Sequence, residues 1–172
     1  MTRSPVGLDF VILRPHFFMN NCLFGAAESI ASDGTVRYAL GDARVGMVDP
    51  RDISDTAARA LIDPRWDGGT YDLTGPQSIS GHDVAEYLSA ELGRKVRYVS
   101  IAPEAAADLV RSMGGNEWQA EATRGYFSAY ASGWGDFTTD WVPKISGHAA
   151  RPFSQFAREV MLPALKLRAD AA

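Results

Sequence analysis

The first hydrophobic segment is a continuous apolar run, Phe10–Leu13, which stops at Arg14-Pro15. Uninterrupted runs of this length are typical of parallel strands covered on both faces. Proline has no N–H group and disfavours helical geometry in the residue before it, so the pattern predicts a strand over residues 8–14. The segment His16–Asn21 mixes aromatic, apolar and amide side chains and is expected to lead into a helix.

Apolar spacing predicts alternating helices and strands along the rest of the chain. The predicted helices cover about residues 17–31, 50–63, 81–92, 103–113, 117–132, 139–146 and 152–167, and the predicted strands cover 35–40, 70–74 and 95–101. Asp49 before Pro50, and Asn116 before the fifth helix, are expected N-caps. This alternation predicts an α/β fold with a largely parallel sheet, in a single domain over residues 1–172.

Composition narrows the classes of function. The chain has 172 residues, of which 46% are hydrophobic and 22% charged, as is normal for a folded globular domain. Its net charge is −4 and it has no cluster of Lys and Arg, so no nucleic-acid partner is expected. The single cysteine, Cys22, cannot form an internal disulfide, and no apolar run approaches the ~20 residues that span a bilayer. We therefore expect a cytoplasmic protein without membrane contact.

The end of the first strand is the best candidate for a ligand site. In open α/β sheets, ligands bind beyond the carboxyl ends of the strands. Pro15, His16, Phe17 and Phe18 follow that end directly, and His16 carries the side chain best suited to acid–base chemistry near neutral pH. The alternative is that proline ends the strand and the phenylalanines fill the core.

Amide and aromatic residues could complete such a site. Asn20 and Asn21 can donate to a substrate carbonyl, although a role at the helix start explains them equally well. Tyr126 and Tyr130 recur at helical spacing and could line a lid over an aromatic substrate. Together with Trp118 and Trp134 they are favoured as a core stripe.

Metal binding is not expected. Asp49, Asp52 and Asp55 cluster at a helix start, where an N-cap and the helix dipole explain acidic residues. The three histidines are dispersed, which makes a zinc site improbable.

Four segments resemble the NmrA-like family of atypical short-chain dehydrogenase/reductase proteins. They are L-R-P-H-F-F-M-N-N (13–21), G-M-V-D-P-R-D-I-S-D-T-A-A-R-A-L-I-D-P (46–64), Y-D-L-T-G-P (71–76) and G-H-A-A-R-P-F-S-Q-F-A-R-E (147–159). The resemblance is to the C-terminal half of that family. It implies a partial Rossmann-like parallel sheet with a C-terminal helical substrate-binding region.

The resemblance also assigns roles to residues. It implies an NAD(P)H-dependent oxidoreductase, with Pro15, His16, Phe17 and Phe18 at the positions that flank the cofactor and substrate, and with Asn21 aligned to the family's Asn. The family has no fixed histidine here, so His16 is the catalytic candidate because of its own chemistry. Asn20, Tyr126 and Tyr130 are likewise substrate candidates because of their side chains and spacing. The sequence contains no Gly-rich dinucleotide turn and no Tyr-x-x-x-Lys pair. Because the turn holds the pyrophosphate, NAD(P) binding is expected to be weak or absent in this chain alone.

Three functions remain open. The first is the substrate-binding half of an NAD(P)H-dependent reductase acting on an aromatic or quinone-like small molecule, completed by a chain that supplies the missing N-terminal half. The second is a non-catalytic regulatory or redox-sensor module. The third is a dimeric, cofactor-independent enzyme acting on an aromatic or polycyclic metabolite. A homodimer would also cover a strand edge that the absent strands leave bare.

Overall fold

The computed structural model describes residues 9–169. Its strands are β1 (Ile12–Pro15), β2 (Thr35–Tyr38), β3 (Thr70–Leu73) and β4 (Arg97–Ser100). Its α-helices are α1 (Ala26–Asp33), α2 (Pro50–Ile62), α3 (Gly81–Leu92), α4 (Pro103–Ser112), α5 (Glu117–Ala131), α6 (Trp141–Ser146), α7 (Phe153–Phe156) and α8 (Leu162–Ala169). Shorter helical turns are η1 (Met19–Leu23), η2 (Pro64–Trp66) and the π-helical η3 (Ala157–Met161). None of the described helices is both long enough and apolar enough to cross a membrane.

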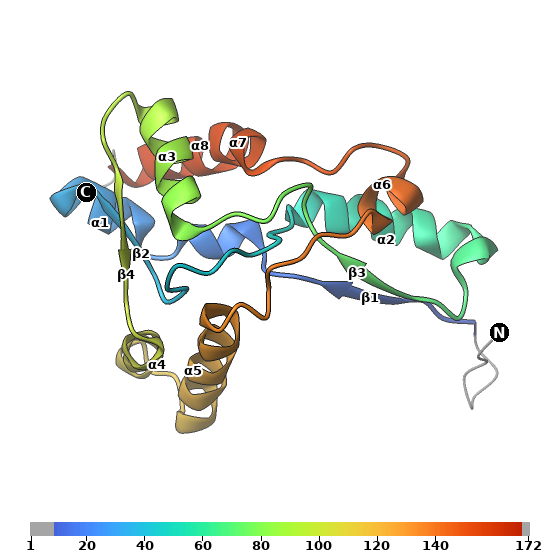
Figure 1. Cartoon of the computed structure of the whole chain (residues 1–172), viewed down its shortest axis with the longest axis horizontal. Coiled ribbons are helices and arrows are strands. Elements are labelled where there is room, and N and C mark those ends of the chain that lie inside the picture. Colours follow the sequence, from blue (N-terminus) through green and yellow to red (C-terminus); the bar gives the residue numbers. More distant parts are fainter. Residues whose placement is uncertain (1–8, 170–172) are drawn as a thin grey trace.

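The strands form two separate parallel pairs, β1–β3 and β2–β4. Ile12 lies opposite Thr70 in the first pair, and Thr35 lies opposite Arg97 in the second. Figure 1 shows α4 and α5 projecting together from the β2–β4 side of the molecule, away from β1. The predicted α/β class, the parallel strands and the C-terminal helical region are confirmed.

One face of the β1–β3 pair is uncovered. Leu13 packs into a small core with Leu73 of β3 and Val142 of α6. On the opposite face, Ile12 is 45% exposed, and Arg14 forms an exposed pair with Asp72 across the strands at 2.7 Å. The prediction of a strand covered on both faces is therefore wrong within the described residues.

The main core lies around the β2–β4 pair. Val36 of β2, Leu88 of α3 and Phe156 of α7 are fully buried there, together with Phe17 from the segment after β1. Burying such side chains stabilises the fold by about 1.5–3 kcal/mol each. This core fixes the segment after β1 against the C-terminal helices.

Local capping chemistry places several helix starts where the sequence predicts them. Asp49 accepts the Arg51 backbone N–H at 2.9 Å at the start of α2. Ser80 and Asn116 form capping boxes at the starts of α3 and α5. These confirmed boundaries fix the elements that surround the candidate site.

Three predicted elements are wrong in detail. The helix expected over 17–31 is divided into η1 and α1 by Gly25, whose φ of +64° ends the first turn. The helix expected over 139–146 is α6, which begins at Trp141 with Asp140 at its N-cap position. The last helix contains a π-helical turn before Pro163, so the backbone widens there and α8 begins a new segment. The first strand, expected over 8–14, is β1 at Ile12–Pro15, so it begins later than predicted and extends one residue further; residue 8 lies outside the described residues.

Candidate site at the carboxyl end of β1

His16 lies at the carboxyl end of the β1–β3 pair. Its backbone N–H donates to the carbonyl of Leu73 at 2.9 Å, so the chain stays on the sheet for one residue beyond Pro15. The Phe17 carbonyl then accepts the Val48 N–H at 2.8 Å. These bonds direct the His16 side chain to the end of the sheet where α/β proteins bind their ligands.

Aromatic rings enclose the His16 imidazole. Trp134 stacks on it, with ring centroids 5.5 Å apart and planes 17° apart. Tyr130 and Phe137 meet it edge-on at centroid distances of 5.2 Å and 4.6 Å. Gly135 allows this close approach, because a Cβ atom there would lie 2.9 Å from the imidazole Cε1. The loop between α5 and α6 therefore closes directly over the ring.

Neither ring nitrogen of His16 has a hydrogen-bond partner among residues 9–169. The residue is 7% exposed, and burial lowers its pKa below the ordinary value while the Asp72 carboxylate opposes that shift. A neutral imidazole has one donor and one acceptor, and leaving such groups unpaired costs about 1–3 kcal/mol each. Trp134 is 62% exposed, so its indole lies between the imidazole and solvent.

Tyr126 and Tyr130 continue the site along one face of α5. Their rings contact each other at 4.7 Å, and Tyr126 stacks on Phe17 at 6.0 Å. Burial raises the pKa of Tyr126 well above its ordinary value, the neighbouring Tyr130 raises it further, and the Asn21 amide opposes the shift. Asn21, Tyr126 and Tyr130 thus form one polar cluster that adjoins His16.

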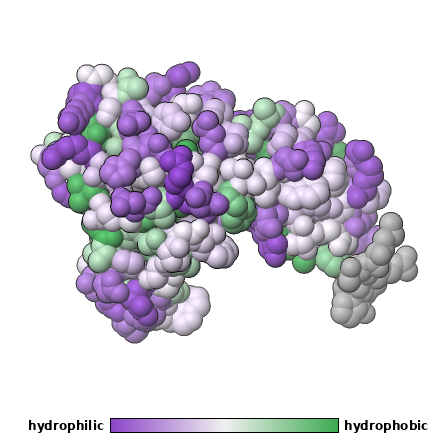
Figure 2. Space-filling model, in the orientation of Figure 1, coloured by the Kyte–Doolittle hydropathy of each residue, from purple (hydrophilic) through white to green (hydrophobic). Residues whose placement is uncertain are grey.

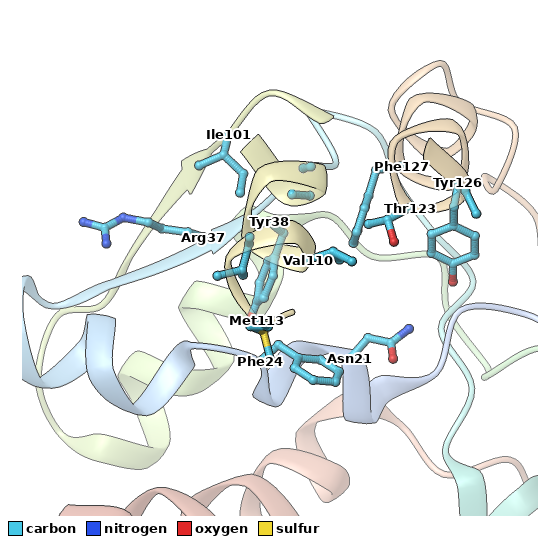
Figure 3. A pocket seen from close by; sticks show the side chains of 14 residues that line it. Asn21, Phe24, Arg37, Tyr38, Ile101, Val110, Met113, Thr123, Tyr126 and Phe127 are labelled. Atoms are coloured by element: carbon cyan, nitrogen blue, oxygen red, sulfur yellow. The ribbon is translucent and has the colours of Figure 1, made fainter. Parts of the chain in front are cut away.

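A cavity of about 540 Å³ opens beside this cluster (Figure 3). It lies between η1, β2 and the α4–α5 hairpin, and fourteen residues line it. They are Asn21, Phe24, Arg37, Tyr38, Ala39, Ile101, Ala106, Leu109, Val110, Met113, Ala122, Thr123, Tyr126 and Phe127. Most of these side chains are apolar, which suits a small-molecule site.

The remaining predicted site residues lie around this centre. Pro15 is half-buried and Phe17 is fully buried. Phe18 and Asn20 are exposed and do not line the cavity. The structure therefore gathers Asn21, Tyr126 and Tyr130 near His16 and leaves Phe18 and Asn20 on the outer surface.

The expected aromatic core stripe is only partly correct. Tyr130 is buried, but Trp118 is 76% exposed and Trp134 stacks on His16 instead of entering the core. Phe137 and Met113 were not anticipated in the site. The sequence held two signals that could have indicated them: the glycines flanking Trp134 for the loop that carries Phe137, and the apolar spacing within α4 for Met113.

An acidic cluster on α2 is tied to the C-terminal segment. Asp52 accepts the Arg151 backbone N–H at 2.8 Å and pairs with its guanidinium. Asp55 lies 3.0 Å from both Arg151 and His148. The oxygens and nitrogen of Asp52, Asp55 and His148 lie within 4.8 Å of one another, and the Arg151 guanidinium pairs with both carboxylates. The helix dipole alone therefore does not explain these acidic residues.

Comparison with known proteins shows which proteins this chain is similar to. No protein-family model matches it. It is 38% identical over 152 residues to the NAD(P)H azoreductase of Xenophilus azovorans, an alignment that covers 88% of this chain and 53% of that protein. The chain spans about half the length of the curated relatives it matches.

Solved structures agree with this placement. The NADPH-dependent quinone oxidoreductase of Escherichia coli superposes with a TM-score of 0.78 at 20% identity, over 91% of this chain and 57% of that one. The negative transcriptional regulator NmrA in complex with NAD superposes with a TM-score of 0.69 at 17% identity, over 96% of this chain and 56% of that one. These neighbours establish the fold, and they confirm the resemblance found in the sequence.

Proposed function

Because this chain has the fold of the C-terminal half of the NmrA-like NAD(P)-binding proteins, we propose that it is the substrate-binding half of an NAD(P)H-dependent oxidoreductase. The dinucleotide-binding half would come from outside this sequence, either on a longer chain or on a second polypeptide. The substrate would be a small aromatic or quinone-like molecule. Similar proteins include a reductase of azo compounds and one of quinones, according to their names.

The observation that carries this proposal is the unpartnered His16 imidazole at the carboxyl end of β1. Buried polar groups in folded proteins nearly always have hydrogen-bond partners. Both nitrogens of His16 lack one among the described residues, and the group covering them is an exposed aromatic ring. This is the arrangement expected of a site whose ligand replaces that ring.

The residues of the strand end fit one end of the cofactor. NAD(P)H, when bound, supplies the hydride. Pro15 and Phe17 would hold the backbone against the nicotinamide end, because their neighbours on the sheet fix them. His16 would contact the same end and donate its N–H to the substrate oxygen on which negative charge develops. A lowered pKa keeps the imidazole neutral, which suits a hydrogen-bond donor better than a proton donor.

The substrate would lie against the polar cluster. Asn21 and Tyr126 line the cavity, and the Tyr130 ring contacts the Tyr126 ring at 4.7 Å. Phe18 and Asn20, which are exposed here, would form the outer wall once the second half is in place.

The open side of β1 suggests where that second half lies. β1 pairs only with β3 among residues 9–169, and Ile12 projects from its uncovered face. Unpaired strand edges attract another strand. Figure 2 shows the molecule hollowed between the α5 region and the part that carries β1, which leaves space for an additional domain or chain. A second copy of the chain could cover the same edge, and light scattering after size exclusion separates a monomer from a dimer.

The proposal predicts a large difference in cofactor affinity between this chain alone and a chimera. The chimera would join the N-terminal half of the Xenophilus azovorans azoreductase to this chain. We expect no NADPH binding by the chain up to about 1 mM and micromolar binding by the chimera, because the pyrophosphate anchor accounts for most of the affinity. Isothermal titration calorimetry measures both, and oxidation of NADPH with a quinone acceptor measures turnover.

Matched chimeras make the test specific. Replacing with valine the glycines of the Gly-rich turn that the added half is expected to supply should abolish binding, whereas Tyr87→Phe, remote from the strand end, should leave it unchanged. Tight NADPH binding by the isolated chain would contradict the proposed division of the site.

A regulatory module is the second candidate, and the missing Tyr-x-x-x-Lys pair favours it. The structural neighbour NmrA is named as a negative transcriptional regulator. A chimera that binds NADPH in the micromolar range but does not oxidise it with quinone or azo acceptors would support this candidate over the reductase.

A further inference from the structure

The cavity beside α5 has one polar end and an apolar body. Figure 3 shows Asn21, Thr123 and Tyr126 on one side of it, with Phe24 and Met113 toward the other. The apolar part of the cavity is open to solvent in this chain, because Phe24 is 68% exposed and Met113 is 72% exposed. Exposed apolar surface gathered around a cavity marks a binding site.

Charge is directed away from the cavity. Arg37 is its one charged lining residue, and its guanidinium forms an ion pair with Asp33. Figure 3 shows this side chain extending outward. The Tyr38 hydroxyl is also committed, because it donates to the Cys22 carbonyl at 2.9 Å. An anionic ligand would therefore find no free counter-charge inside the cavity, and burying an unpaired charge is costly.

Hydrogen-bonding capacity remains at the polar end. The Asn21 amide has two hydrogens to donate, and Figure 3 shows it beside the Tyr126 hydroxyl. The Tyr126 hydroxyl can rotate. The Tyr130 ring, 4.7 Å from the Tyr126 ring and 5.2 Å from the His16 imidazole, connects this end of the cavity to the aromatic enclosure of His16.

We propose that the cavity binds an uncharged, largely apolar ring system, and that Asn21 and Tyr126 hold a carbonyl-type oxygen of it other than the one that His16 would contact. This inference rests on the proposed function and specifies its substrate class. A volume of about 540 Å³ lies within the range of sites for drug-sized ligands, so it has room for a molecule of two or more rings. The oxygen lies at the polar end and the rings lie against Val110 and Met113.

The test uses the isolated chain with three probes: 2-acetylnaphthalene, 2-ethylnaphthalene and 2-naphthoate. Methyl-¹³C labelling of methionine makes the exposed Met113 a reporter, while Met19, Met47 and Met161 are buried internal controls. We expect saturable shifts of the Met113 signal, with the ketone binding about fivefold more tightly than the hydrocarbon and at least about tenfold more tightly than the carboxylate.

The variant Tyr126→Phe removes one hydroxyl from the polar end. It should lower the affinity for 2-acetylnaphthalene about fivefold and change the affinity for 2-ethylnaphthalene by less than about twofold. Tyr87→Phe is the matched control, since this tyrosine packs against Phe153 away from the cavity, and it should change neither affinity.

Each other outcome overturns the inference. An unshifted Met113 signal at probe saturation would show that the cavity is not the site. Equal affinities for ketone and hydrocarbon, or tight binding of naphthoate, would show that an uncharged oxygen is not what it recognises. None of these measurements involves NADPH, so failure of the chimera to bind or oxidise NADPH would leave the probe results standing.

Discussion

Replacing Asp52 with alanine is expected to destabilise the fold by about 3 kcal/mol, because it leaves the Arg151 guanidinium without its buried counter-charge. Asp52 is fully buried and accepts the Arg151 backbone N–H as well as the guanidinium. Burial raises the pKa of Asp52 even though these hydrogen bonds lower it, which indicates that the pair gains little over its desolvation cost. Chemical denaturation followed by circular dichroism measures the loss.

Asp55→Ala is the matched control for this prediction. Asp55 also contacts Arg151, at 3.0 Å, but its side chain is half-exposed, so its loss should cost less than about 1 kcal/mol. The double variant Asp52→Leu/Arg151→Met should recover part of the loss, because it removes both charges together. Equal destabilisation by Asp52→Ala and Asp55→Ala would mean that burial does not decide the effect.

The Asp52–Arg151 pair illustrates which parts of the fold the sequence predicts. The N-caps Asp49 and Asn116 act on backbone groups two or three residues away, so their neighbours in the sequence were sufficient to identify them. Asp52 has its partner 99 residues away. Its acidic character near a helix start was visible, but the arginine that explains its burial was not.

The candidate site likewise has a part that the sequence predicts and a part that it does not. The apolar run into Arg14-Pro15 and the family resemblance located His16 at a strand end, because both signals lie within one short segment. The cavity needed η1, β2 and the α4–α5 hairpin to converge, and no spacing in the sequence encodes that convergence. The apolar run before Arg14 also predicted a strand covered on both faces. The face that the structure leaves uncovered is the feature that now suggests an additional polypeptide there.

His16→Leu is expected to stabilise this chain by about 1–2 kcal/mol, the opposite of a typical core substitution. The two side chains have similar volumes, and leucine removes two buried nitrogens that have no partner among the described residues. The loss of stacking on Trp134 and of edge contacts with Tyr130 and Phe137 offsets part of the gain. Thermal and denaturant unfolding at pH 7.5 measure the difference.

His16→Asn is the matched control, because asparagine has nearly the shape of leucine but keeps an unpaired polar group. It should be less stable than His16→Leu by about 1–3 kcal/mol. A leucine variant less stable than the native chain, together with an asparagine variant of native stability, would indicate that the imidazole has a solvent partner in solution.

The stabilising effect of leucine should grow as the pH falls. Burial lowers the folded-state pKa of His16 below its ordinary value of 6.5, so the unfolded chain takes up a proton that the folded chain does not. Between the folded pKa and 6.5 the native chain therefore loses stability as the pH decreases, whereas the leucine variant lacks this contribution. His82 and His148 occur in both proteins and cancel in the comparison. A site that keeps a destabilising imidazole under a displaceable ring is expected to have a function that requires it, so the same substitution should remove turnover from the chimera while it strengthens the fold.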